Sequence, residues 1–111
     1  ATGVDCSGFI SRCWKLSRHY STRELPHLCE ALASYQDLRA GDILNKHNDH
    51  VVLFWKFVDD SQTHFLAYEV GSPPSWVVTL NKIPVEYMKS KGYKPLRYKK
   101  MKSDVSQSLR L

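Results

Sequence analysis

The chain has 111 residues, enough for one compact domain and too few for two. Hydrophobic residues make up 42% and charged residues 24%, which is the composition of a globular protein rather than of a disordered chain. No apolar run reaches the roughly 18 to 20 residues that cross a bilayer, and residues 1–4 show no signal-peptide pattern. We therefore expect one globular domain without a membrane span.

The formal net charge of +5 is concentrated late in the chain, where seven Lys and Arg residues lie between residues 89 and 102. Such a run can attract polyanions, including nucleic acid or an anionic cell-wall polymer. A solvated last strand and tail explain the same run more simply, so we expect no nucleic-acid partner.

Three cysteines, Cys6, Cys13 and Cys29, form an odd set without a C-x-x-C pair. This spacing implies neither a disulfide framework nor a zinc ribbon. At least one thiol must stay free or pair between chains. One free thiol is what a cysteine hydrolase needs.

The first predicted element is a helix over residues 5–17. Its apolar residues recur with the 3.6-residue period of one helix face, and Asp5 and Ser7 are of the type that caps helix starts. The apolar positions are Cys6, Phe9, Ile10, Cys13 and Trp14.

A second, short helix is predicted over residues 28–35, and a run of strands follows it. The strands are expected at residues 42–45, 50–58, 63–70 and 76–80. A short helix over residues 84–91 has Pro84 near its first turn, and Pro95 marks a closing strand over residues 93–100 as an edge strand. One helix followed by meandering strands predicts an α+β fold with an antiparallel sheet.

The start of the first helix is a favourable position for a nucleophilic thiol. Unpaired amides and the helix dipole stabilise a thiolate there, and the backbone N–H of Cys6 is a candidate donor to an oxyanion. In the alternative interpretation Cys6 is only the first buried residue of the apolar face, as we expect for Cys13.

His50 opens the predicted strand 50–58, after a polar loop at residues 46–49. An imidazole at that position can reach a helix N-terminus packed against the sheet, which is the Cys–His arrangement of papain-like enzymes. A histidine there often only caps the strand. His47 and His50 also form an H-x-x-H pattern, but two rings at a loop–strand boundary do not converge, so we expect no metal site.

A third group should orient the imidazole, and the hairpin after His50 proposes Glu69. If Asp59 and Asp60 are the two central turn residues, His50 pairs directly with Glu69. A turn longer by two residues keeps both on one face of the sheet, whereas a slip of one residue puts them on opposite faces. The alternative is that Glu69 is a surface carboxylate at a strand end.

Three segments resemble the NlpC/P60 family of cell-wall cysteine peptidases. Residues 3–10, GVDCSGFI, are similar to the family signature D-C-S-G-[LF]-[VI]. Residues 38–44, LRAGDIL, are similar to its L-x-P-G-D-L segment, and residues 50–54, HVVLF, to its H-V-G-I-Y strand.

This resemblance implies a papain-like core over residues 1–103, with the Cys-bearing helix packed on the sheet and residues 104–111 as a tail. It implies catalysis by Cys6, His50 and a third residue; Glu69 replaces the family's usual His, Asn or Gln, as in the related CHAP amidases. Asp5 and Ser7 would line the substrate cleft. The family's upstream helix has no counterpart in this chain, and we expect that part of the fold to be absent.

By the same resemblance, the expected activity is hydrolysis of peptidoglycan stem peptides, often between D-Glu and the diamino acid, without metal or cofactor. This implies the cell envelope or the extracellular space, although the sequence leaves the cytoplasm open. One alternative is a CHAP-like amidase or another acyl-amide hydrolase. Another is a non-catalytic binding module with a degenerate cleft.

Overall fold

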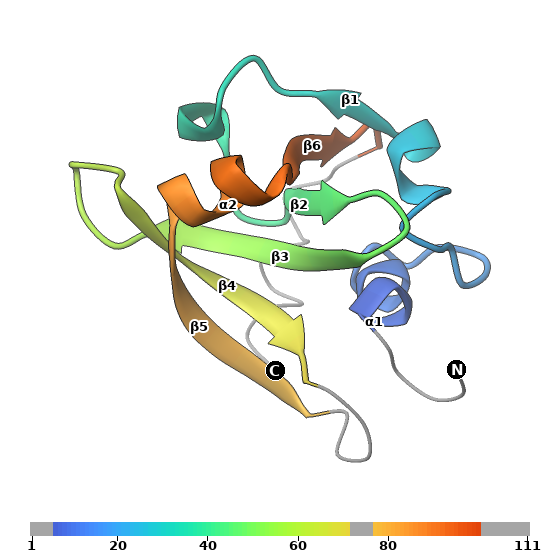
Figure 1. Ribbon diagram of the computed structural model, residues 1–111. Coiled ribbons are helices and arrows are strands. Elements are labelled where there is room, and N and C mark those ends of the chain that lie inside the picture. The colour runs from blue at the N-terminus through green and yellow to red at the C-terminus, as the bar shows by residue number, and fades with distance from the viewer. Residues whose placement is uncertain (1–5, 72–76, 101–111) are drawn as a thin grey trace.

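The computed structural model describes residues 6–71 and 77–100, which form a six-stranded antiparallel sheet with two α-helices (Figure 1). The helices are α1 (Cys6–Cys13) and α2 (Val85–Lys91), and short 3-10 helices lie at Leu25–Leu28 and Tyr35–Asp37. The strands are β1 (Cys29–Ala31), β2 (Ile43–Lys46), β3 (His50–Phe57), β4 (His64–Val70), β5 (Val78–Pro84) and β6 (Lys94–Tyr98). They lie in the order β1-β6-β2-β3-β4-β5. The predicted α+β class with an antiparallel sheet is confirmed.

Helix α1 has Cys6 in its first turn, as predicted, but ends at Cys13 and not at residue 17. Lys15 turns the chain with a φ of 56°. Its N–H and that of Leu16 donate to carbonyls of the last helical turn at 3.0 and 2.9 Å. This is the Schellman pattern of helix termination, here with lysine in the position that glycine usually takes.

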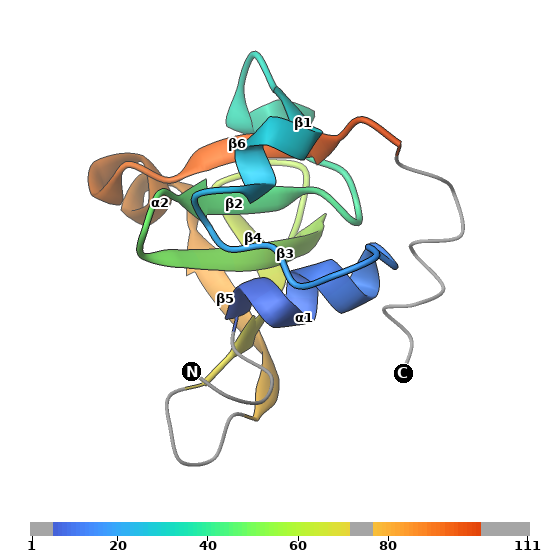
Figure 2. The same ribbon diagram turned by 90° about the vertical axis from the view of Figure 1, so that its right-hand side faces the viewer.

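The sheet carries apolar side chains on both faces, and each face has its own helix. Side chains alternate along a strand, so Val51 and Leu53 of β3 belong to the core that Ile10 of α1 enters. Val52 and Phe54 belong to a second core on the opposite face, which includes residues of α2. Figure 2 shows α1 beneath β3, with α2 on the other side of the sheet.

The predicted strands from residue 42 to residue 80 are found, with shifted ends. Strand β5 begins at Val78 and runs on to Pro84, four residues beyond the predicted end, while Trp76 lies outside the described residues. Pro84 is the N-cap of α2, and Gly92, with a φ of 82°, ends that helix. The predicted tail, residues 104–111, also lies outside the described residues.

The predicted helix over residues 28–35 is wrong. Cys29 to Ala31 form strand β1, which pairs with β6, and two 3-10 helices flank it. The local sequence suits a helix, but the partner strand lies more than sixty residues later in the chain. Long-range pairing therefore overrides a local preference here.

The prediction that Pro95 marks an edge strand is also wrong, because β6 lies between β1 and β2. The Pro95 carbonyl accepts a hydrogen bond from Leu32 N–H at 3.0 Å, so the backbone of Pro95 faces β1. In an antiparallel strand the N and C=O of one residue point to the same side. Strand β1 ends at Ala31, so the missing N–H of Pro95 lies where the neighbouring strand stops.

Candidate active site

Cys6 is the first residue of α1 and is half-buried against the core on the α1 face of the sheet. The positive end of the helix dipole stabilises a thiolate at this position. Helix α1 packs against β3 and, less extensively, against β4. Cys6 therefore lies on the α1 face of the sheet. His50 and Glu69 come from the strands that α1 contacts, β3 and β4, but by strand alternation their side chains belong to the α2 face.

The other two thiols lie in environments that oppose ionisation. Cys13 and Cys29 are both buried, whereas Cys6 is partly accessible. Burial raises the pKa of the Cys13 thiol to about 11, partly offset by Arg12. Burial, aided by the charge of Asp42, raises the pKa of Cys29 to about 12. Of the three cysteines, Cys6 alone combines access with a helix N-terminus.

We expect iodoacetamide to modify Cys6 first at mildly acidic to neutral pH. In the folded chain Cys13 and Cys29 should stay protonated and unreactive until the pH approaches about 11 and about 12. In denaturant both should react with the ordinary thiol pKa of 9.0. Mass spectrometry of the labelled peptides gives the order of reaction. Faster labelling of Cys13 or Cys29 in the folded chain would show that the nucleophile is misassigned.

His50 is the first residue of β3 and is half-buried. The tight turn before it places Asn48 in the left-handed region, with a φ of 61°, and Asp49 N–H donates to the Lys46 carbonyl at 3.0 Å. The imidazole makes an edge contact with the Tyr93 ring, with 6.5 Å between ring centroids and 87° between planes. The approach of the Cys6 sulfur to a His50 nitrogen stays a prediction.

The predicted direct pairing of His50 with Glu69 is wrong, but both side chains belong to the same face. Strands β3 and β4 pair Leu53 with Tyr68 and Phe54 with Ala67, a register two residues longer than the predicted one. A bulge after Phe54 then shifts the rest of the hairpin by one more residue.

Because side chains alternate, Glu69 lies on the Ala67 face of β4 and His50 on the Phe54 face of β3, which is the same core. In this register the two are diagonal neighbours, with backbones roughly 7 to 8 Å apart. No hydrogen bond or ion pair joins them within residues 6–71 and 77–100. Glu69 is thus near His50 but not hydrogen-bonded to it.

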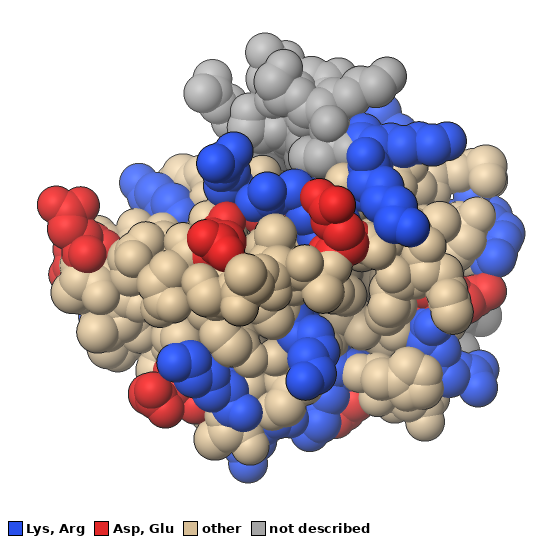
Figure 3. Space-filling model, turned by 90° about the horizontal axis from the view of Figure 1, so that it is seen from above, with Lys and Arg blue, Asp and Glu red and all other residues tan. Residues whose placement is uncertain are grey.

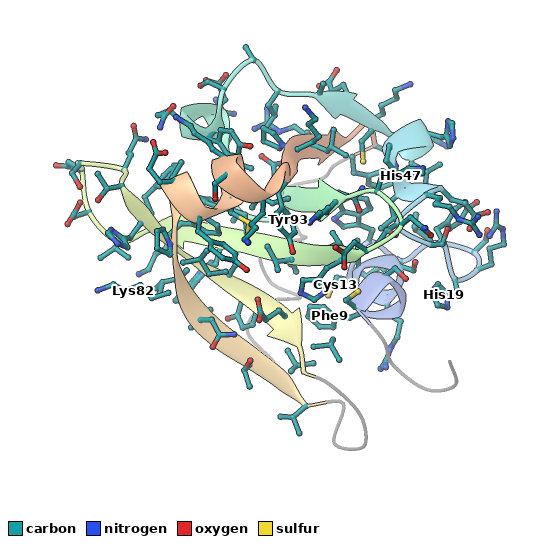
Figure 4. The ribbon with its side chains drawn as sticks, in the orientation of Figure 1. Phe9, Cys13, His19, His47, Lys82 and Tyr93 are labelled. Carbon is teal, nitrogen blue, oxygen red and sulfur yellow. The ribbon has the colours of Figure 1, made fainter. Side chains whose placement is uncertain are left out.

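Tyr93 is a site residue that the sequence analysis missed. It is buried directly after α2, where its N–H donates to the Met88 carbonyl at 3.0 Å and helps to end that helix. Burial raises the pKa of its phenol to about 12, and the charges of Asp49, Glu69 and Cys6 act in the same direction. Tyr93 therefore contacts His50 and lies within electrostatic range of both Cys6 and Glu69. Figure 4 shows it above β3, near the centre of the molecule.

Of the two predicted substrate-binding residues, Asp5 and Ser7, the structure describes only Ser7. Asp5 lies outside the described residues. Ser7 is buried, and its hydroxyl lies 2.9 Å from Nε2 of His19, so a side chain of the following loop engages it. Ser7 therefore takes part in packing the start of α1, and a role toward substrate stays a prediction.

No group of three His, Cys, Asp or Glu side chains able to hold a metal ion occurs in the described part of the chain. His47 is exposed on the β2–β3 turn, and Figure 4 shows it away from the labelled side chains of α1. The described helices include none long and apolar enough to cross a membrane. On the face seen in Figure 3, basic side chains alternate with acidic and neutral ones and do not form a single basic patch.

An open hollow lies at the β3–β4 turn, lined by Phe57, Val58, Asp59, Asp60 and Gln62. His50 is at the opposite end of β3, roughly 23 Å away for a strand of this length. The hollow is therefore separate from the candidate active site.

Comparison with protein-family models, with curated proteins and with solved structures gives no match to this chain.

Proposed function

We propose that the protein is a cysteine hydrolase that cleaves amide bonds, with Cys6 as nucleophile, His50 as general base and Glu69 as the residue that orients His50. The observation that carries the proposal is the surrounding of Tyr93. This buried ring contacts His50. Besides burial, the charges of Cys6 and Glu69 contribute to the raised pKa of its phenol. All three proposed residues therefore act on one buried side chain, His50 by contact and Cys6 and Glu69 by their charge.

In the proposed reaction, His50 takes the proton of the Cys6 thiol, and the thiolate attacks the carbonyl carbon of the amide. The backbone N–H of Cys6 is the proposed donor to the oxyanion. Protonated His50 then gives its proton to the leaving amine, and the acyl group stays on sulfur as a thioester. His50 next removes a proton from water, which attacks the thioester carbonyl. The C–S bond breaks, the carboxylic acid is released, and His50 returns the proton to the Cys6 sulfur.

The proposed substrate class is the peptidoglycan stem peptide, on the strength of the NlpC/P60 resemblance, which covers about residues 3–70. The proposed location follows from the substrate and is the cell envelope or the extracellular space. Glu69 favours a second candidate, a CHAP-like amidase, since the third residue there is glutamate. Both candidates use the same thiol and imidazole, and they differ in the bond that is cleaved.

Incubation with purified muropeptides, followed by mass analysis of the products, tests the proposal. Cleavage between D-Glu and the diamino acid supports the endopeptidase, and release of the intact stem peptide from the sugar supports the amidase. If neither occurs and muropeptides bind unchanged, the chain is a non-catalytic binding module.

Glu69 variants test the role of the third residue. Glu69→Ala should lower kcat more than Glu69→Gln, because alanine removes the hydrogen-bond acceptor as well as the charge. The prediction requires the Glu69–His50 hydrogen bond to form when substrate binds, since catalytic hydrogen bonds tighten in the substrate complex. A hydrogen bond to a charged group contributes about 1.5 to 3 kcal/mol, so alanine should cost roughly 10- to 100-fold in kcat. Thr79→Ala, which changes the residue directly opposite on β5, is the matched control and should leave kcat near the wild-type value. Equal kcat for all three variants would make Glu69 a bystander, with Tyr68 or a backbone carbonyl as the next candidate.

A further inference from the structure

An apolar strip crosses the open part of the sheet on the face that carries α1. We define it by Trp55, Tyr68, Leu80 and Val78, which come from β3, β4 and β5. Tyr68 pairs directly with Leu53 on one side and with Leu80 on the other. Directly paired residues share a face, and Leu53 belongs to the core that α1 covers.

The β5 end of the apolar strip is uncovered. Leu80 and Val78 keep 42% and 41% of their surface exposed, although they follow directly from a packed core. Trp55 and Tyr68 are half-buried, with ring centroids 6.1 Å apart. Large exposed apolar groups that are contiguous, rather than scattered singly, mark binding surfaces.

The apolar strip continues into the candidate active site. Cys6, Trp55 and Tyr68 all pack against the same core, and α1 contacts both strands that carry the two aromatic rings. Figures 1 and 2 show α1 next to β4. A substrate bound at Cys6 therefore has an apolar surface next to it.

Two lysines lie at the end of the apolar strip that is far from Cys6. Lys56 pairs with Leu66, and Leu66 pairs with Lys82, so both lysines lie on the same face as Tyr68 and Leu80. Lys56 Nζ lies 4.5 Å from the centre of the Trp55 ring. Strand β4 advances by roughly 13 Å over the four residues from Leu66 to Val70. Figure 4 shows Lys82 at the end of the sheet far from Phe9 of α1.

We infer that the apolar strip binds the acyl part of the substrate, and that this acyl part is an apolar chain ending in an anionic group. This inference rests on the proposed cysteine hydrolase, because the scissile carbonyl must lie at Cys6, and it names an acyl class other than the stem peptide for the same nucleophile. The chain then lies along Tyr68 and Leu80, and its anionic end meets Lys56 and Lys82. The surface is apolar along its length and has two lysines at one end. It therefore suits an acyl chain with an anionic end better than an uncharged lipid.

Acyl p-nitroanilides provide the test of specificity. Suberoyl, with a terminal carboxylate, should have the highest kcat/KM, followed by octanoyl and then acetyl. Leu80→Glu should lower kcat/KM for suberoyl about tenfold, because apolar contact area is lost and the new charge repels the carboxylate. It should leave acetyl unchanged. Val58→Glu alters an equally exposed valine at the remote hairpin turn and should change neither.

Lysine variants test the anionic end. Lys82→Glu should remove the preference for suberoyl over octanoyl, a change of roughly two- to fivefold because the contact is solvent-exposed. Lys91→Glu makes the same charge change on α2, on the other face of the sheet, and should leave the preference intact. Equal kcat/KM for the three acyl groups would overturn the inference while leaving the hydrolase function in place.

A binding experiment distinguishes the failure of this inference from the failure of the proposed function. Isothermal titration of the Cys6→Ala chain with suberic acid monoanilide should show binding that Leu80→Glu weakens about tenfold. Binding without turnover by the native chain would overturn the hydrolase and retain the apolar strip as an acyl site. Absence of binding would overturn the acyl site. A dimer that Leu80→Glu dissociates would also overturn it, because the strip would then be a subunit interface.

Discussion

Replacing Cys6 by alanine is expected to abolish muropeptide turnover, with a loss of at least roughly 10⁴-fold in kcat. The proposed reaction passes through a thioester on this sulfur, and neither buried thiol can substitute for it. Cys13 and Cys29 are buried, and burial raises the pKa of each, to about 11 and about 12. The measurement is single-turnover product formation followed by mass spectrometry.

Cys13→Ala is the matched control, since it removes a sulfur from the same helix. It should lower stability slightly by leaving a small cavity, while the folded fraction keeps its kcat. Circular dichroism and thermal melting show whether each variant is folded. Turnover by folded Cys6→Ala within about tenfold of the native rate would exclude covalent catalysis at this residue.

The parts of the fold that were predictable depend on local patterns. The apolar period over residues 6–14 corresponds to α1, and the alternation after residue 42 corresponds to β2, β3 and β4. These patterns report the face that each element buries, which is a property of a few neighbouring residues. The early end of α1 was not predictable in the same way, because lysine is an uncommon residue for the left-handed position.

The parts that were missed depend on partners far away in the chain. Strand β1 has three residues and exists through its pairing with β6. Pro95 is tolerated inside the sheet because β1 stops beside it. Neither condition is visible within a window of ten residues. The same holds for the β3–β4 register, since a bulge cannot be counted from the turn sequence alone.

The residues of the candidate site show the same difference between local sequence patterns and long-range contacts. Cys6 and His50 were selected because each opens an element, and both do so. Glu69 was selected by register, and the face was right although the pairing was wrong. Tyr93 carries no motif, and its position depends on the end of α2 and on the pairing of β6. Its ordinary residue type gave no signal before the structure placed it against His50.

Replacing Asp42 by alanine is expected to lower the free energy of unfolding by about 3 to 5 kcal/mol. Asp42 is fully buried, and its carboxylate accepts hydrogen bonds from Arg97 Nε at 3.0 Å, Arg97 Nη2 at 2.8 Å and Arg39 N–H at 2.8 Å. Alanine would remove the only carboxylate that the guanidinium pairs with among the described residues and leave it the Asp37 carbonyl, to which Nη2 also donates at 3.0 Å. Urea unfolding followed by tryptophan fluorescence measures the loss.

Glu24→Ala is the matched control, because Glu24 also pairs with an arginine, Arg18, at 3.0 Å. That pair is exposed, so water and salt screen it and its removal should have a far smaller effect. Asp42→Asn keeps an acceptor in place and should destabilise less than alanine. A loss below about 1 kcal/mol for Asp42→Ala would mean that Arg97 finds other partners without cost.

The expected loss at Asp42 also bears on the site. Trp14 at the end of α1 donates from Nε1 to the Gly41 carbonyl at 2.9 Å, directly before Asp42, and its ring stacks on Tyr98 of β6. One turn therefore ties β6 and the helix that carries Cys6 to the start of β2. The Gly41–Asp42 turn thus has a structural role, through the Trp14 hydrogen bond and the ion pair of buried Asp42 with Arg97. We therefore expect Asp42→Ala to raise the reactivity of Cys13 toward iodoacetamide together with the loss of stability, since both follow from loosening of the same helix.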